Sequence, residues 1–277
     1  MLNTPIIKKI EEFVSVKPRS VQEISEHIGK NWRTADRYIT EIGKEFGTIS
    51  TRTFREGTRG ALKIVFWSSM EKIHSNAFQE ILESEIMKGK TKYEFSPFDI
   101  FQHIEDKNKE AWINQGEEEE FGIEKLKNLL EQTQKQLLIF SGNLSFINFK
   151  DKNIGIFQII DQLVKKGVNI KIVSRVDLAG KENIEKVLSL NYKYGKELIE
   201  IRHREQPLRA IVIDNKIFNI KEIKQPTGRE KELNRKTFIF YTIKDKDWTS
   251  WISRIFWKMF SSSVDSKKRL GEINKLN

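Results

Sequence analysis

The chain has 277 residues, of which 38% are hydrophobic and 32% charged, and its formal net charge is +10. This length allows two domains with a connecting segment, and the positive charge suits a polyanionic partner. Cysteine is absent, which excludes disulfides and thiolate metal sites and favours an intracellular, cytoplasmic location. No apolar run approaches the ~20 residues of a membrane helix, and the start of the chain does not resemble a signal peptide.

Two short helices are predicted at the start of the chain. The first begins at Thr4, where an amphipathic pattern of period 3.6 starts. The second begins at Ser20, which with Glu23 forms an S-x-x-E capping box. Gly29 is expected to end this second helix because glycine adopts the left-handed conformation at little cost.

A third helix follows, and its two faces differ in chemistry. The face expected to be buried carries Ala35, Ile39, Ile42 and Phe46. The opposite face carries Trp32, Arg33, Asp36, Arg37 and Thr40. Asn31 is suited to cap this helix. Because arginine is the commonest reader of guanine, Arg33, Thr34 and Arg37 are the expected base contacts of a DNA-recognition helix.

A β-hairpin is predicted after the third helix, with strands over 49–54 and 61–67 and a glycine-bearing turn over 56–60. Arg52, Arg55, Arg59 and Lys63 decorate it and are expected to meet phosphates or the minor groove. Residues 1–67 therefore read as a winged helix-turn-helix that binds double-stranded DNA. Its expected DNA-binding residues are Asn31, Trp32, Arg33, Thr34, Arg37, Arg52, Arg55, Arg59 and Lys63. The alternative is a winged helix that binds protein.

Residues 68–135 are predicted to form a helical connector. An amphipathic helix with apolar positions from Ile73 to Ile86 opens the segment, and another runs from Phe121 to Leu130. A helix directly after a winged helix often pairs two subunits, since DNA half-sites are usually related by two-fold symmetry. A homodimer is therefore expected, and the alternative is a helix that packs on its own chain.

Alternating strands and helices are predicted for a second domain over 136–277. A buried strand at 137–142, a helix at 156–166 and a strand at 168–174 make a βαβ unit, so these strands are expected to be parallel. Asp214-Asn215 is expected to turn a hairpin between two strands. The tryptophan-rich helix that starts near Asp247 is expected to be core. The predicted fold class is α+β in the first domain and α/β in the second.

The second domain resembles the phospholipase D-like domain of TrmB-family archaeal transcription regulators. The resemblance is carried by LLIFSG (137–142), by KKGVNIKIVS (165–174) and by EIRHREQPLRAIVIDNKIFNI (200–220). It implies a winged helix, a helical connector and a phospholipase D-like mixed sheet. It also implies an effector-sensing role, with a sugar as the small-molecule effector on the resemblance alone.

Active phospholipase D-like enzymes carry HxKxxxxD, in which the histidine is the nucleophile, the lysine holds phosphate and the aspartate supports the histidine. Aligned on Asp214, the histidine position is Pro207 and the lysine position is Arg209. Proline cannot form a phosphohistidine, and His203 lies four residues away from the required position. The resemblance therefore implies a scaffold without catalytic residues.

Other chemistry finds little support. The sequence contains no HExxH zinc motif, no phosphate loop of the GxxxxGK[ST] type and no GxGxxG, so neither a metal nor a cofactor is expected. The prediction is a non-enzymatic, sequence-specific transcription regulator. Two other hypotheses stay open: a phospholipase D-like nuclease targeted by a winged helix, and a protein-interaction scaffold.

Overall fold

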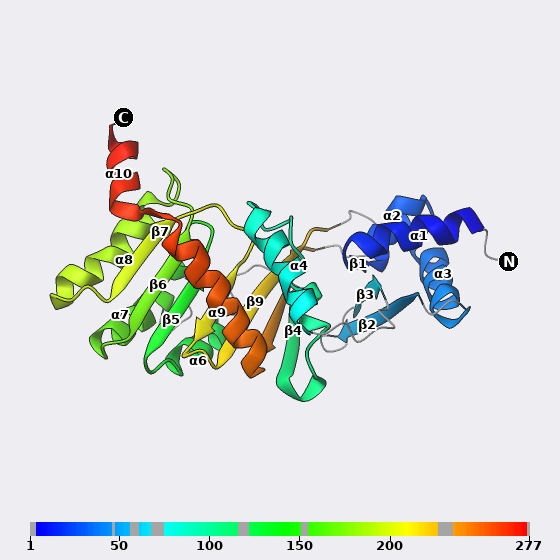
Figure 1. Cartoon of the computed structure of the whole chain (residues 1–277), viewed down its shortest axis with the longest axis horizontal. Coiled ribbons are helices and arrows are strands. Elements are labelled where there is room, and N and C mark those ends of the chain that lie inside the picture. Colours follow the sequence, from blue (N-terminus) through cyan, green and yellow to red (C-terminus); the bar gives the residue numbers. More distant parts are fainter. Residues whose placement is uncertain are drawn as a thin grey trace.

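The computed structural model describes residues 4–45, 48–55, 61–67, 75–115, 122–150, 155–226 and 235–275. A three-stranded sheet and an eight-stranded sheet organise these residues. The small sheet and the first three helices, here called the N-terminal domain, lie at one end of an elongated molecule (Figure 1). The large sheet and its helices, here called the sheet domain, occupy the rest.

The N-terminal domain has the predicted winged helix-turn-helix architecture. Its elements are α1 (Thr4–Val16), β1 (Arg19–Ser20), α2 (Val21–Ile28), α3 (Trp32–Glu45), β2 (Ile49–Arg55) and β3 (Ala61–Trp67). Ser20 and Glu23 form the predicted capping box, and Gly29 ends α2 with φ 66°. Ile24 and Ile39 belong to a core shared by the three helices and the hairpin. The predicted order of elements is therefore confirmed.

The sheet domain is built on eight strands in the order β11-β7-β6-β5-β8-β9-β10-β4. Its strands are β4 (Lys109–Gln115), β5 (Gln136–Phe140), β6 (Asn169–Ser174), β7 (Ile199–His203), β8 (Ala210–Ile213), β9 (Ile217–Lys224), β10 (Thr237–Ile243) and β11 (Val264–Asp265). Its α-helices are α4 (Ser75–Lys88), α5 (Phe98–Phe101), α6 (Gly122–Glu131), α7 (Ile156–Lys165), α8 (Lys181–Tyr194), α9 (Lys246–Ser261) and α10 (Ser266–Asn274). Two short 3-10 helices, η1 (Asp106–Asn108) and η2 (Ser145–Asn148), complete it.

Strand directions divide the large sheet into two parts. Strands β5, β6 and β7 are parallel, as the predicted βαβ unit requires. Strands β8, β9, β10 and β4 pair antiparallel in the other half. Asp214 and Asn215 turn β8 into β9 with φ of 49° and 55°, which is the predicted hairpin. The sheet is therefore mixed.

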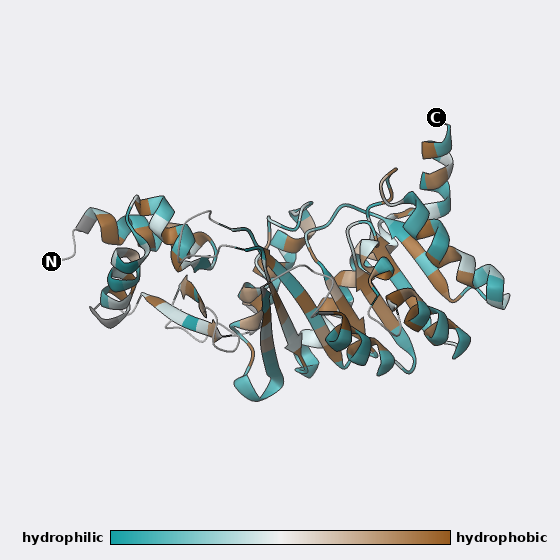
Figure 2. Cartoon of the chain, turned by 180° about the vertical axis from the view of Figure 1, so that it is seen from behind, coloured by the Kyte–Doolittle hydropathy of each residue, from teal (hydrophilic) through white to brown (hydrophobic). Residues whose placement is uncertain are grey.

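Different helices cover the two faces of the large sheet (Figure 1). Side chains alternate along β5, so that Leu138 and Phe140 pack with α4, α5 and α9, while Leu137 and Ile139 pack with α6, α7 and α8. Figure 2 shows hydrophobic residues concentrated along these strands. Trp251 of α9 is buried in the first of these cores, as expected for a core helix.

The connector differs from the helical segment expected from the sequence. Residues Lys109–Gln115 form β4, which pairs with β10 along its whole length and ends the large sheet. This stretch is polar, so its sequence shows no strand pattern. An edge strand can be polar because little of its outer face is buried. The predicted limit at residue 135 stays a prediction. Helix α4 packs against α9 of its own chain, with Leu82 and Ile86 buried.

The hairpin of the N-terminal domain also packs on the sheet domain. Phe54 of β2 enters the core under α4, α5 and α9, with its ring 6.1 Å from that of Phe98 and 6.2 Å from that of Tyr241. Leu62 and Ile64 of β3 are buried in the same core. One face of the wing is thus occupied by contact with the sheet domain, whereas Thr51 and Thr53, on the opposite face of β2, are exposed.

Candidate nucleic-acid interface and sheet-domain cavity

Helix α3 presents the predicted polar face to solvent. Ala35, Ile39 and Ile42 are fully buried, whereas Arg33 and Arg37 are exposed on the opposite side. Figure 1 shows α3 at the end of the molecule away from the sheet domain. The buried stripe fixes the helix on its own core and leaves these cations accessible, as a groove-reading helix requires.

Asn31 begins this helix as predicted, because its Oδ1 accepts a hydrogen bond of 2.9 Å from the backbone N–H of Thr34. Trp32 is 38% exposed beside it. Arg37 lies 3.9 Å from Glu41, a loose and solvated ion pair that a phosphate or a base could replace. Among the described residues, Arg33 has no ion-pair partner.

Register divides the basic residues of the wing between its two faces. Thr53 pairs with Lys63, so these two residues share the face on the side of α3. Lys63 Nζ lies 2.7 Å from Asp36 Oδ1 and ties the hairpin to α3. The side chain of Arg55 and the whole of Arg59, in the 56–60 turn, lie outside the described residues. Their predicted contacts stay predictions.

Arg52 lies on the face of the wing opposite Lys63, and its predicted contact with DNA stays a prediction. It pairs with Ile64 in the hairpin, and its Nη1 lies 3.2 Å from Asp106 Oδ1. Its guanidinium also sits 5.0 Å from the ring centre of Phe101. Strand alternation is the signal that places Arg52 and Lys63 on different faces of the hairpin, and the grouping from sequence did not use it. Arg52 therefore binds the sheet domain in this arrangement.

A polar network joins the two domains beside these contacts. Lys224 of β9 lies 3.6 Å from Glu23 of α2 and 3.1 Å from Glu222. Glu222 also accepts hydrogen bonds from Ser96 and Tyr241, at 3.0 and 2.7 Å. Burial acts to lower the pKa of Lys224, but the carboxylates of Glu222 and Glu23 outweigh it and raise this pKa. The network holds a charged contact between α2 and β9.

The residues aligned with the phospholipase D motif do not form a catalytic group. Arg209 and Asp214 lie at opposite ends of β8. The Asp214 carboxylate accepts three backbone hydrogen bonds, from Gln134, Lys135 and Gln136, at 2.8–2.9 Å. His203 Nδ1 accepts one from the backbone N–H of Val176, at 2.9 Å. Asp214 thus has a structural role in the loop before β5.

Replacing Asp214 with alanine should lower the free energy of unfolding by about 1–2 kcal/mol. Three N–H groups lose a charged acceptor. The cost stays moderate because Gln134 and Lys135 are exposed and water can partly replace the carboxylate. Urea denaturation followed by circular dichroism measures it. Asp161→Ala, which removes a surface pair with Lys193, should cost less than about 1 kcal/mol. Equal losses would contradict the role assigned to Asp214.

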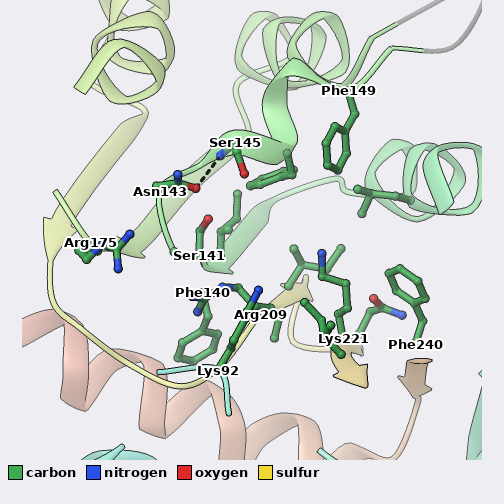
Figure 3. Close-up of a pocket in the computed structure, with 18 of the residues that line it drawn as sticks. Lys92, Phe140, Ser141, Asn143, Ser145, Phe149, Arg175, Arg209, Lys221 and Phe240 are labelled. Atoms are coloured by element: carbon green, nitrogen blue, oxygen red, sulfur yellow. Dashed lines mark hydrogen bonds between the residues drawn. The ribbon is translucent and has the colours of Figure 1, made fainter. Parts of the chain in front are cut away.

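A cavity of about 510 Å³ opens where β5, β6 and β8 meet η2 and the loop that follows α4. Figure 3 shows Ser141, Asn143, Arg175 and Arg209 gathered at one end and Phe149 and Phe240 at the other. Five of the described residues that line it are basic and none is acidic; the basic ones are Lys90, Lys92, Arg175, Arg209 and Lys221. Of these five, only Arg209 could be singled out from the sequence, as a motif position.

Arg209 is half-buried at the cationic end of this cavity. Its Nη1 donates to two backbone carbonyls, those of Leu208 at 2.7 Å and Gln206 at 3.4 Å. Burial, and then the nearby Arg175 charge, lower the pKa of Arg209 to about 10, so it remains a cation at neutral pH. Arg175 itself pairs with Asp177, at 2.6 Å. Arg209 and Arg175 thus place two cations at one end of the cavity, and Lys221 adds another basic residue near Phe240 (Figure 3).

The described part of the chain contains neither a cluster of metal-ligating residues nor a helix able to span a membrane. Its histidine, aspartate and glutamate residues include no group of three arranged to hold a metal ion. Among the same residues, no helix combines the length and apolar character that crossing a bilayer demands.

No family model matches the sequence, and no curated protein matches it. Solved structures show weak likenesses. The archaeal chromatin protein TrmBL2 is 17% identical, with 95% of this chain and 94% of that chain covered and a TM-score of 0.39. Nuc of Salmonella typhimurium, a phospholipase D family member, is 10% identical, with 57% and 97% covered and a TM-score of 0.43. A phosphatidylserine synthase of Haemophilus influenzae Rd KW20 is 13% identical, with 57% and 39% covered and a TM-score of 0.40. Such likenesses assign no activity to this chain.

Proposed function

We propose that this protein is a cytoplasmic, sequence-specific regulator of transcription that binds double-stranded DNA through α3 and the α3 side of its wing. The observation that carries the proposal is the placement of Arg33 and Arg37 on the exposed face of a helix whose other face is fully buried. Lys63 adds a cation on the adjoining hairpin. Arginines on such a helix can reach base edges, and hairpin cations can meet phosphates.

The sheet domain is proposed to be non-catalytic. Pro207 stands where the nucleophile of a phospholipase D-like enzyme would be, and His203 is held by the backbone of Val176. Neither can provide the covalent step that this chemistry needs. A nuclease would therefore need residues that the described cavity does not contain, because its lining has neither histidine nor a carboxylate.

A homodimer is also part of the proposal, since two recognition helices one DNA turn apart read a two-fold operator. The buried side of α4 is occupied by its own chain, so dimerisation needs another surface. Light scattering after size-exclusion chromatography tests this directly. A monomer at all concentrations, with and without DNA, would contradict it.

Replacing Arg33 or Arg37 with alanine should weaken binding to a selected operator by about 1–3 kcal/mol each and relax its sequence preference. The operator is first selected from genomic fragments, and affinity is then measured by fluorescence anisotropy at several salt concentrations. The parent should lose affinity steeply as salt rises, because phosphate contacts release counterions. Arg254→Ala, which removes an exposed arginine from α9, is the matched control.

Two results would contradict the DNA-binding proposal. One is parent-like binding by Arg33→Ala, Arg37→Ala and the double variant. The other is the absence of any salt-dependent binding by the parent, which would favour the protein-interaction scaffold.

A further inference from the structure

The cavity of the sheet domain has the chemistry of a ligand site. Its cationic end holds Arg209 and Arg175, and its other end is formed by Phe149 and Phe240 (Figure 3). A volume of about 510 Å³ is large enough for a small metabolite. We propose that it binds a small molecule that carries a phosphate group on an apolar or aromatic body, and that its occupancy alters how the N-terminal domain is held.

The charge of Arg209 is the reason to expect an anionic group on the ligand. A half-buried guanidinium normally faces a carboxylate, yet no carboxylate of the described chain lies within ion-pair distance of Arg209. Its only described acceptors are two backbone carbonyl oxygens, which carry no full charge. A phosphate placed between Arg209 and Arg175 would supply the missing negative charge and accept bidentate hydrogen bonds from guanidinium. The anion therefore completes a site that the chain leaves positively charged.

The guanidinium of Arg209 lies close to Gly142. A Cβ added at Gly142 would lie 2.8 Å from Arg209 Nη2, closer than contacts between such atoms allow. The guanidinium thus lies directly against the glycine backbone at the end of β5. Gly142→Ala should displace Arg209 without removing its charge, so this variant separates the position of the cation from its presence.

The apolar end of the cavity is the reason to expect a ligand with an apolar part in addition to its phosphate group. Ile123 and Leu126 of α6 also line the cavity, in addition to Phe149 and Phe240. Burying an aromatic ring among such side chains stabilises a complex, whereas a free phosphate would leave this space to water. An organic phosphate should therefore bind more tightly than inorganic phosphate.

The wall of the cavity connects it to the N-terminal domain. Lys92, Tyr93 and Ile223 line both this cavity and a second one, of about 410 Å³, that lies between the domains beside Lys17 and Glu23. The carbonyl oxygen of Tyr93 accepts a hydrogen bond from Lys17 Nζ, at 3.4 Å. An anion that attracts Lys92 would move the loop on which Lys17 rests. This coupling, unlike ligand binding itself, rests on the proposed DNA-binding function.

Binding is tested on the full chain by isothermal titration calorimetry and thermal shift. The probes are phenyl phosphate, inorganic phosphate and phenol, which separate the complete molecule from its head group and its ring. Phenyl phosphate should bind about tenfold more tightly than inorganic phosphate, and phenol should not bind measurably. Equal affinities of the two phosphates would overturn the apolar part of the proposal. Failure of both to bind would overturn it entirely.

Variants locate the site. Arg209→Ala should weaken phenyl phosphate by about tenfold or more, because a charged hydrogen bond is lost. Gly142→Ala should weaken it as well, and so should Lys92→Glu, which reverses the charge of a partly exposed residue in the loop that follows α4. Lys165→Ala removes an exposed cation from the far end of α7 and should bind like the parent. Parent-like binding by Arg209→Ala and Lys92→Glu would place the anion elsewhere and overturn the site.

Coupling is tested by repeating the operator titration with saturating phenyl phosphate. The parent's affinity for DNA should change by at least about fivefold, and that of Arg209→Ala should not. An unchanged affinity in the parent would overturn the coupling. If the parent binds no DNA at all, the proposed function fails, while the calorimetry still decides whether the ligand site exists.

Discussion

Phe54→Ala should lower the free energy of unfolding by about 3–5 kcal/mol, because it removes a large buried ring. Phe54 belongs to the winged helix, yet its ring is buried among Phe98, Phe101 and Tyr241 of the sheet domain. Removing it leaves a cavity at the point where the two domains meet. The destabilisation combines the transfer free energy of the ring with the weaker dispersion attraction among the side chains that line the new cavity.

Urea denaturation of the full chain, monitored by circular dichroism and by tryptophan fluorescence, measures this effect. Thr53→Ala is the matched control, because Thr53 is the exposed neighbour on the opposite face of the same strand. It should change stability by less than about 0.5 kcal/mol. If Phe54→Ala behaves like Thr53→Ala, the wing does not dock on the sheet domain in solution.

His103 should make the protein less stable as the pH falls, by about 2–3 kcal/mol between neutral pH and about pH 4. Its ring packs against Phe78 and Trp248, and its Nε2 is buried without a hydrogen-bond partner among the described residues. Burial, and then the Lys109 charge, lower the pKa of His103 from 6.5 to about 4.

The direction of this pH dependence follows from the lowered pKa of His103. His103 is neutral in the folded state, whereas the unfolded chain takes up the proton near the ordinary histidine pKa. The stabilisation is therefore complete above the unfolded pKa of 6.5 and is lost as the pH falls towards about 4. His103→Phe keeps a ring between the same neighbours but cannot be protonated.

Comparing the pH dependence of unfolding for the parent and His103→Phe isolates this contribution from that of the carboxylates. The variant should lose distinctly less stability over the same range. His27→Phe is the control, because His27 also stacks on an aromatic ring, that of Phe13, but is largely exposed. Identical pH profiles for the parent and His103→Phe would show that His103 is charged or solvated in the folded protein.

Local signals allowed much of the fold to be predicted. The Ser20–Glu23 box and Gly29 define α2 through hydrogen bonds among near neighbours, so the sequence is sufficient there. The Asp214-Asn215 turn is equally local, because both residues tolerate positive φ. By contrast, β4 carries no strong pattern of its own. It forms a strand because β10 supplies its hydrogen-bond partners from a distant part of the chain.

The candidate sites divide in the same way. Asn31, Arg33 and Arg37 could be assigned to one end and one face of α3 because helical periodicity determines both. The ion pair of Arg52 with Asp106 could not be predicted without knowing that the sheet domain covers one face of the wing. The cavity around Arg209 could not be predicted from the sequence either, because Lys92, Ser141 and Arg175 come from separate loops.

The sequence by itself therefore determined the winged helix, its cation-bearing recognition face, the βαβ unit and the absence of a phospholipase D nucleophile at Pro207. These features depend on spacing, capping and residue identity, which act over a few residues. Only the tertiary structure decided which face of the wing remains free, where the connector becomes a strand, and that basic side chains converge on a cavity whose described lining contains no acidic residue. Those features depend on contacts between residues far apart in the chain, which no local pattern encodes.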